Sequence, residues 1–307
     1  MRALVTGADG FVGGWLVQHL ESEGDEVWLG TRIRSHAGGR RRNMDVLDQA
    51  SVEATLSWAA PTVIYHLAAI AFGPDVTADI GRAIDVTVRG TAFVLEAAAG
   101  MHPPPTVLIP SSSEVYGPAG EEALLETRSP SPSSLYGATK LAQETLGLTY
   151  HRGGVLPVVV ARAFNHIGPG QRETFVVASL AAQLAEIASG RVEPILRVGN
   201  LDAERDFTDV RDVVRAYRAL AAGGHTGEPI NVASGQVVAI RSVVDQLIAL
   251  SGTDVVIEVD PSRLRAHDVP VIRGDSTHLR RLTGWQPRVS LDRTLRDIWG
   301  DAGRRHR

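Results

Sequence analysis

Residues 3–13 read Ala3-Leu4-Val5-Thr6-Gly7-Ala8-Asp9-Gly10-Phe11-Val12-Gly13. The apolar run that ends at Thr6 predicts a strand, and residues 11–23 predict a helix. Glycines between the two allow a tight turn, a close backbone approach to a pyrophosphate and close helix–strand packing, while the helix N-terminus attracts negative charge. This stretch therefore predicts a dinucleotide site formed by Gly7, Gly10, Phe11, Val12 and Gly13.

The remainder of the first half repeats this alternation of short β-branched strands and helices. We expect strands at residues 26–31, 62–69, 107–110 and 157–164, and helices at 80–100 and 135–151. Strands that alternate with helices are typical of a parallel sheet. The sequence thus predicts an α/β fold with a Rossmann-type doubly wound parallel sheet.

The pattern changes after Asn165. Residues 175–189, 210–222 and 240–250 predict helices, residues 230–233 and 255–259 predict strands, and a short helical tail starts at Leu291. We expect a dinucleotide-binding domain at 1–164, rejoined by about 206–234, and a smaller α/β substrate lobe at 165–205 and 235–307. Residues 304–307 are expected to be a frayed polar tail.

Composition excludes several classes of function. The chain has 307 residues, 44% of them hydrophobic and 21% charged, as in a packed globular protein of about two domains. It contains no cysteine, which excludes disulfides, thiolate metal sites and cysteine nucleophiles. A net charge of −4 argues against nucleic-acid binding. No apolar run is long enough to span a membrane, and the first residues already form a strand pattern rather than a signal peptide. We expect a cytoplasmic protein without a bound metal.

The end of the second strand indicates which dinucleotide is bound. An acidic residue there would hold a ribose 2′-hydroxyl, but this chain has Arg32, which suits a 2′-phosphate. NADP(H) is therefore favoured, with NAD(H) as the alternative. Asp45 and Val46 are expected to flank the adenine, and Leu67, Ala68 and Ala69 to line the pyrophosphate and ribose.

A tyrosine and a lysine form the candidate catalytic pair. Tyr136 and Lys140 lie one helical turn apart on the same face, and Lys140 is the only lysine in the chain. A nearby ammonium group lowers the pKa of a phenol, which is otherwise about 10. Ser111, Ser112, Ser113 and Glu114 follow another strand and reach the carboxyl edge of the sheet, where such folds bind ligands.

Together these motifs resemble the extended short-chain dehydrogenases/reductases, which modify nucleotide-activated sugars. The resemblance covers essentially the whole chain and includes His66-Leu67-Ala68-Ala69. It implies that Tyr136 donates or accepts the proton, that Lys140 lowers the pKa of Tyr136, and that Ser112 hydrogen-bonds the substrate oxygen. It also implies cofactor contacts at Thr87 and Ala163 and a homodimer formed through the helices that contain Tyr136 and Thr91.

Motifs in the second half of the sequence point to one group within this family. Residues 163–171 (AFNHIGPGQ) and 173–179 (ETFVVAS) are similar to GDP-4-keto-6-deoxy-D-mannose reductases, which make GDP-rhamnose; residues 205–210 and 284–287 fit as well. The implied partner is a GDP-activated sugar, and Arg205 and Arg265 are expected to bind its diphosphate through bidentate hydrogen bonds. The implied substrate-binding residues are Ser112, Ser113, Asn165, Phe175, Val176, Arg205 and Arg265.

Three positions depart from the family pattern. Thr87 replaces the asparagine of the family's Asn-x-x-Gly-Thr helix, and Leu135 replaces the proline that commonly precedes Tyr136. Glu114 stands where GDP-mannose 4,6-dehydratases carry a catalytic glutamate, so we count it among the candidate catalytic residues with Ser112, Tyr136 and Lys140.

The leading prediction is an NAD(P)H-dependent reductase of a 4-keto-6-deoxy nucleotide sugar. Glu114 keeps open a 4,6-dehydratase or an epimerase that cycles a tightly held NAD(P). A non-catalytic dinucleotide sensor is the third alternative. The retained Tyr136–Lys140 pair argues against the sensor.

Overall fold

The larger part of the protein is built on a seven-stranded sheet in the order β10-β6-β5-β4-β1-β2-β3. The computed structural model describes residues 1–32, 39–118, 120, 122–264 and 269–306. All neighbouring strands of this sheet run parallel. The strands are β1 (Arg2–Thr6), β2 (Glu26–Thr31), β3 (Arg41–Asn43), β4 (Val63–His66), β5 (Thr106–Ser112), β6 (Val158–Ala163) and β10 (Pro229–Val232). The predicted doubly wound fold is confirmed.

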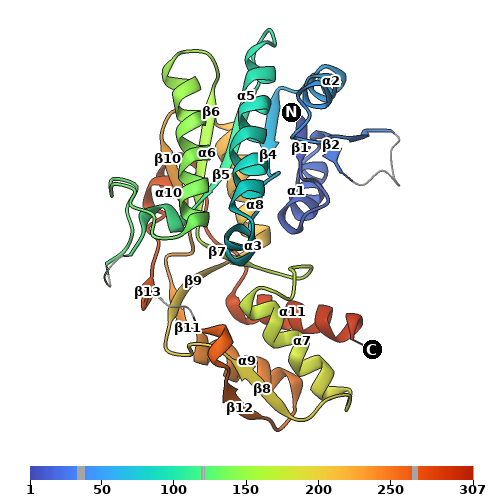
Figure 1. Ribbon diagram of the computed structural model, residues 1–307, viewed down its shortest axis with the longest axis vertical. Helices are drawn as coiled ribbons and strands as arrows, with labels where there is room; N and C mark the ends of the chain where they lie inside the picture. The colour runs from blue at the N-terminus through green and yellow to red at the C-terminus, as the bar shows by residue number, and fades with distance from the viewer. Residues whose placement is uncertain (33–38, 119, 121, 265–268, 307) are drawn as a thin grey trace.

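Helices cover both faces of this sheet (Figure 1). One face carries α1 and α8, whose Leu16, Leu20 and Tyr217 pack in one buried cluster with the strands. The other carries α2, α5 and α6, with Leu56 and Leu95 in a second cluster. The helices of this part are α1 (Phe11–Ser22), α2 (Gln49–Ala59), α3 (Gly73–Ala78), α4 (Ile80–Ile84), α5 (Gly90–Ala99), α6 (Leu135–Arg152), α8 (Val210–Ala222) and α10 (Thr277–Thr283), with a 3₁₀ turn η3 (Ser113–Tyr116).

The predicted helix at 80–100 is not continuous. A π-helical turn, η2 (Asp85–Arg89), separates α4 from α5. The Thr91 hydroxyl donates to the carbonyl of Thr87 at 2.6 Å, and a Cβ on Gly90 would lie only 3.0 Å from Val46. The hydrogen bond lies within the helix, and the lack of a Cβ on Gly90 lets the helix approach Val46, which follows β3. Such π-turns are frequent at functional sites, and this one carries Thr87.

The smaller lobe lies below the large sheet in Figure 1 and has its own core. Leu184, Val243 and Leu295 belong to a separate buried cluster. Strand β9 pairs with β7, β11 and β13, and β8 pairs with β12. The elements of this lobe are β7 (Asn165–Ile167), α7 (Val176–Ala188), β8 (Ile195–Val198), β9 (Glu204–Asp209), β11 (Val237–Ala239), α9 (Ile240–Ser251), β12 (Val256–Val259), a 3₁₀ turn η4 (Pro261–Arg263), β13 (Val271–Ile272) and α11 (Leu291–Arg305).

Two segments return to the large sheet between parts of the lobe, and α11 then ends the described chain within the lobe. β10 adds the outermost strand beside β6, and Leu279 and Trp285 pack in the same cluster as α1 and α8. Through this packing, α10 lies against the helices of the large sheet rather than in the smaller lobe. The domain boundaries drawn from the sequence remain a prediction.

The C-terminal residues are ordered rather than frayed. α11 extends through Arg305, and His306 Nε2 lies 3.0 Å from Glu173 Oε1. The expectation of a frayed tail is wrong for residues 304–306, because their side chains find acidic partners on the helix and on α7; Arg307 lies outside the described residues. No described helix is long and apolar enough to cross a membrane.

Candidate active site

The parallel sheet gathers the predicted site residues at one edge. The carboxyl ends of β1, β4, β5 and β6 meet there, and β1 lies beside β4 at the point where the strand order reverses. Doubly wound sheets bind ligands at such a switch point. Leu67, Ala68 and Ala69 follow β4 directly, and Ala163 lies opposite Ser112 in the β5–β6 ladder.

The glycine-rich turn has the geometry of a phosphate cradle. Gly7 has a φ of +65°, and a Cβ there would lie 3.0 Å from the Ala68 nitrogen. A Cβ on Gly13 would overlap the carbonyl oxygen of Gly7. Gly10 caps α1 without any side-chain hydrogen bond, so the first N–H groups of the helix face the turn. This backbone fits a dinucleotide pyrophosphate at the start of α1, beside Phe11 and Val12.

The residues expected around the adenine and its ribose lie beyond the glycine-rich turn. Arg32 is exposed at the end of β2 and makes no ion pair within the part of the chain that the structure describes. Arg41 Nη1 lies 2.5 Å from Asp9 Oδ1 and neutralises the one acid of the turn. Asp45 is exposed, and Val46 is buried against Gly90. Because Asp9 is paired with Arg41, the exposed guanidinium of Arg32 is available to an anionic group.

Thr87 uses its hydroxyl within the protein. Its Oγ1 accepts a hydrogen bond from the Ile70 nitrogen at 3.2 Å. The side chain thus ties the π-helical turn to the segment that follows β4. A contact between Thr87 and a cofactor remains a prediction.

Tyr136 is held by two neighbouring elements. Ser134 caps α6 by accepting from the Gly137 nitrogen at 2.9 Å, and its hydroxyl donates to Glu114 Oε2 at 2.5 Å. Ser112 shares a hydrogen bond with the Tyr136 phenol and accepts from the Glu114 nitrogen at 3.2 Å. Leu135 occupies the first helical position, where the family commonly has proline, and α6 still begins there.

The pKa of Tyr136 does not move in the expected direction. Burial raises the pKa of the phenol, the negative charge of Glu114 raises it further, and the hydrogen bond with Ser112 lowers it by less. The expectation that Lys140 lowers the pKa of Tyr136 is therefore not met in this structure. The physical reason is that Lys140 Nζ is engaged elsewhere, with the Pro110 carbonyl and Gln143 Oε1, each at 2.8 Å.

Lys140 is deeply buried, with 5% of its surface exposed. Burial lowers the pKa of its amine to about 8 because the charged form loses hydration. Unlike arginine, such an amine exchanges its proton near neutral pH.

The expected sugar-binding residues lie on the segment between β7 and α7. Asn165 is half-buried in β7, and His166 stacks on Phe11 with ring centroids 6.3 Å apart. Phe175 packs edge-on against Phe72 at 5.0 Å, and Val176 is exposed. The segment therefore touches the first turn of α1 and the start of α3.

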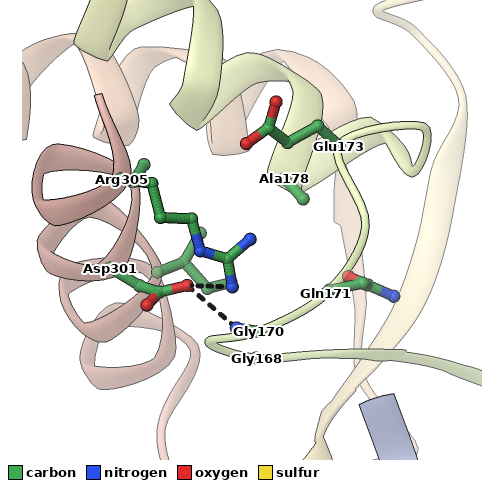
Figure 2. A pocket seen from close by; sticks show the side chains of 9 residues that line it. Gly168, Gly170, Gln171, Glu173, Ala178, Asp301 and Arg305 are labelled. Atoms are coloured by element: carbon green, nitrogen blue, oxygen red, sulfur yellow. Dashed lines mark hydrogen bonds and ion pairs between the residues drawn. The ribbon is translucent and has the colours of Figure 1, made fainter. Parts of the chain in front are cut away.

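The C-terminal helix fixes the loop that joins β7 to α7. Figure 2 shows Asp301 of α11 reaching this loop at Gly170, beside a small pocket that Glu173 and Ala178 also line. Asp301 Oδ2 accepts from the Gly170 nitrogen at 2.9 Å and lies 2.8 Å from Arg305 Nη2. These contacts order a loop whose glycines would otherwise leave it free.

Arg205 is directed differently from the expectation. Its Nη1 donates to the carbonyls of Val269 at 2.8 Å and of Glu204 at 2.9 Å. In this structure Arg205 holds the chain near β13, and a diphosphate contact remains a prediction. Arg265 lies outside the described residues.

The sequence alone did not identify several residues of the site. Ser134 and Gln143 bond to predicted residues, His166 stacks on one, and Arg41 pairs with Asp9 inside the predicted glycine-rich turn. Gln143 follows Lys140 at helical spacing on the same face, which is the one signal that could have pointed to it. The partners of Ser134 and Arg41 are distant in sequence and required the fold.

Comparisons with known proteins agree with this geometry. The sequence profile of the family described as GDP-mannose 4,6 dehydratase matches residues 4–298. GDP-6-deoxy-D-mannose reductase of Pseudomonas aeruginosa is 35% identical over 302 residues, which cover 98% of this chain and 96% of that protein. Human GDP-mannose 4,6 dehydratase is 27% identical over 96% of this chain and 90% of its own length. The solved structure of RMD from Pseudomonas aeruginosa complexed with NADPH has a TM-score of 0.88 and 34% identity, covering 99% of this chain and 100% of that one.

Proposed function

Because the chain belongs to the GDP-mannose 4,6-dehydratase family of extended short-chain dehydrogenases/reductases, we propose that it reduces GDP-4-keto-6-deoxy-D-mannose to GDP-D-rhamnose. The observation that carries this proposal is the placement of Tyr136 at the start of α6, which Ser134 and Glu114 join to the segment after β5, at the carboxyl edge of the sheet beside the glycine-rich cradle. The relative that is 35% identical along nearly its whole length is a reductase of this kind.

NADP(H) is the cofactor that the residues fit best. Gly7, Gly10 and Gly13 leave room for a pyrophosphate, and the exposed Arg32 suits a 2′-phosphate. The similar structure from Pseudomonas aeruginosa contains NADPH, while other similar structures contain NAD, so NAD(H) is the alternative. When bound, NADPH supplies a hydride to the carbonyl carbon of the sugar.

The chain's own residues handle the proton. Tyr136 donates its phenolic proton to the C4 oxygen as negative charge develops there, and Ser112 positions that oxygen with its hydroxyl. The raised pKa of Tyr136 keeps the phenol protonated and ready to donate. Lys140 makes no hydrogen bond with Tyr136 within the described residues; its amine, with a pKa of about 8, is the nearby group on α6 from which we expect the tyrosinate to recover its proton after the step.

Glu114 favours the reductase over the dehydratase. A 4,6-dehydratase needs a carboxylate base that removes the C5 proton. Here the Glu114 carboxylate accepts a short hydrogen bond from Ser134, the residue that caps α6 two positions before Tyr136. We assign Glu114 to holding the start of α6 and to keeping Tyr136 protonated. The dehydratase remains the second candidate, because Glu114 is adjacent to the reacting phenol.

We also propose a homodimer formed through α5 and α6 and a cytoplasmic location. The two helices pack side by side on one face of the sheet, and Figure 1 shows them at the front of the molecule with α3 at their lower ends. Light scattering on the purified protein tests the dimer, and fractionation of cells tests the location.

The experiment is a substrate panel with the purified protein. We expect oxidation of NADPH with GDP-4-keto-6-deoxy-D-mannose and no consumption of GDP-mannose, and Tyr136→Phe serves as the inactive control. Loss of water from GDP-mannose would contradict the reductase and favour the dehydratase.

A further inference from the structure

A continuous chain of buried polar side chains lies behind Lys140. It runs from β1 through β4 and α5 to α6, and each member is at most 5% exposed. The links are Thr6 Oγ1 to His66 Nδ1 (2.9 Å), His66 Nε2 to Thr91 Oγ1 (3.0 Å), Gln143 Nε2 to Thr91 Oγ1 (2.8 Å) and Lys140 Nζ to Gln143 Oε1 (2.8 Å).

The direction of each hydrogen bond among these buried side chains follows from the hydroxyl of Thr91. The Thr91 hydroxyl donates to the Thr87 carbonyl at 2.6 Å, so its oxygen accepts from both Gln143 Nε2 and His66 Nε2. His66 Nδ1 consequently accepts from Thr6. Burial lowers the pKa of His66 to about 3, and the charge of Lys140 adds to this effect, so the imidazole is neutral. The amide of Gln143 can therefore take only one orientation, with its oxygen toward Lys140.

Two neutral oxygens then define the state of the Lys140 amine. Gln143 Oε1 and the Pro110 carbonyl each accept one N–H, and no carboxylate within the described residues is paired with Nζ. The third position on the nitrogen is the one that carries the exchangeable proton in the ammonium form and the lone pair in the amine form. Without an opposing carboxylate, burial keeps the two forms close in free energy.

Burial shifts the pKa of the titratable groups around Lys140. His66 faces it from β4 and His166 from β7, and burial lowers the pKa of both, with a further contribution from the charge of Lys140. Tyr136 lies one turn earlier on α6, and burial and the charge of Glu114 raise its pKa. Burial thus lowers the pKa of both imidazoles and of the amine and raises that of the phenol, and the pKa of the amine falls to about 8.

We propose that Gln143 is a positioning residue for Lys140: its amide oxygen, oriented by Thr91, accepts one N–H of the amine, so that the exchangeable proton is held at the third position, and it supplies a neutral acceptor where a carboxylate would bind the charged form more tightly. Its catalytic consequence rests on the proposed function, because that reaction uses Lys140 to return a proton to Tyr136. The positioning itself is independent of which sugar is the substrate.

The single lysine allows a direct test without any substrate. Protein grown with lysine that is ¹³C-labelled at Cε gives one lysine side-chain signal, because Lys140 is the only lysine in 307 residues. Its chemical shift over pH gives the pKa of Lys140. We compare Gln143→Glu, which places a carboxylate at the amine, with Gln143→Met, which removes the acceptor and keeps the volume. Leu148→Met, a buried change elsewhere on α6, is the matched control.

The proposal predicts shifts of opposite sign. Gln143→Glu should raise the pKa of Lys140 by about one to three pH units, as a charge at this distance does. Gln143→Met should lower it by about one pH unit, because the ammonium loses a hydrogen-bond acceptor. Leu148→Met should leave it unchanged. A signal that titrates at the wild-type pH in both Gln143 variants, or that moves in the same direction in both, would overturn the proposal. If Gln143→Met does not fold, Gln143→Asn is used instead, because its side chain is one methylene shorter and its amide oxygen no longer reaches Lys140.

The pH profile of kcat/KM for NADPH-dependent reduction tests the catalytic part. Its alkaline limb should move upward in Gln143→Glu and downward in Gln143→Met, following the pKa measured by resonance. A limb that stays fixed while the pKa moves would contradict the role of Gln143 in catalysis. Because the resonance measurement needs no substrate, its failure is distinct from a failure to reduce the keto sugar.

Discussion

Replacing Glu114 with glutamine separates a positioning carboxylate from a catalytic base. The carboxylate accepts from Ser134 Oγ at 2.5 Å, a charge-assisted hydrogen bond of the kind worth about 1.5–3 kcal/mol. Glutamine still offers an amide oxygen at the same place, and a neutral hydrogen bond is worth about 0.5–1.5 kcal/mol. The difference of about 1 kcal/mol corresponds to a loss of less than about tenfold in the rate of reduction.

The same substitution should change the pH dependence. Glu114 is the second cause, after burial, of the raised pKa of Tyr136. Reduction needs the protonated phenol, so activity should fall a second time, above the limb set by Lys140, as pH rises through the raised pKa of Tyr136. A neutral glutamine lowers the pKa, so the decline should begin at a lower pH than in the wild-type enzyme.

The assay is the decrease of NADPH absorbance with GDP-4-keto-6-deoxy-D-mannose as substrate, from neutral pH to above the ordinary pKa of a phenol, which is about 10. Glu122→Gln, which neutralises an exposed glutamate near the same loop, is the matched control and should behave as wild type. A loss greater than about a hundredfold in Glu114→Gln would refute the reasoning, because a positioning hydrogen bond cannot account for it.

Three further predictions follow from the same geometry. Tyr136→Phe should lower kcat by orders of magnitude with nearly unchanged NADPH affinity, and Lys140→Arg should be severely impaired because guanidinium does not release a proton near neutral pH; wild-type rates in either would contradict the mechanism. Arg32→Ala should reduce the preference for NADPH over NADH by about 10- to 100-fold in kcat/KM, and an unchanged ratio would assign the 2′-phosphate to another residue. Glu144→Gln should lower the free energy of unfolding by about 3–5 kcal/mol in urea titrations, since it leaves the buried Arg162 guanidinium, now 2.5 Å from Glu144, without a counter-charge.

The sequence predicted the parts of the site that depend on local chain geometry. Gly7 and Gly13 occupy positions where a Cβ would collide with backbone, and that requirement is visible in the spacing of glycines between a strand and a helix. Tyr136 and Lys140 are likewise one turn apart on α6, as their spacing indicated.

Contacts between distant segments could not be predicted in the same way. Arg41 meets Asp9, Ser134 meets Glu114, and Gln143 meets Thr91 only after the sheet has brought their elements together. The pKa of Tyr136 is another example. Proximity along the helix suggested an effect of Lys140, but the lysine bonds to Pro110 instead, and burial dominates the pKa of the phenol.

Secondary structure shows a similar division. Amphipathic α8 was predicted with its observed ends, because apolar residues recur at helical spacing and Asp209 caps its N-terminus. The π-turn within the helix at 80–100 was not predicted, since it reflects the close approach of Gly90 to Val46 rather than any local propensity. The three-residue strand β3 was missed because its arginines carry no alternating apolar pattern.

The central claim is that the chain reduces a C4 ketone with an external hydride, and the fate of that hydride tests it most directly. NADPH with both hydrogens at nicotinamide C4 replaced by deuterium is incubated with GDP-4-keto-6-deoxy-D-mannose, and the product is analysed by proton NMR. The account predicts one deuterium at C4 of GDP-D-rhamnose for each NADPH oxidised, and no transfer with Tyr136→Phe. Product without deuterium at C4, or elimination of water from GDP-mannose without net oxidation of NADPH, would contradict it.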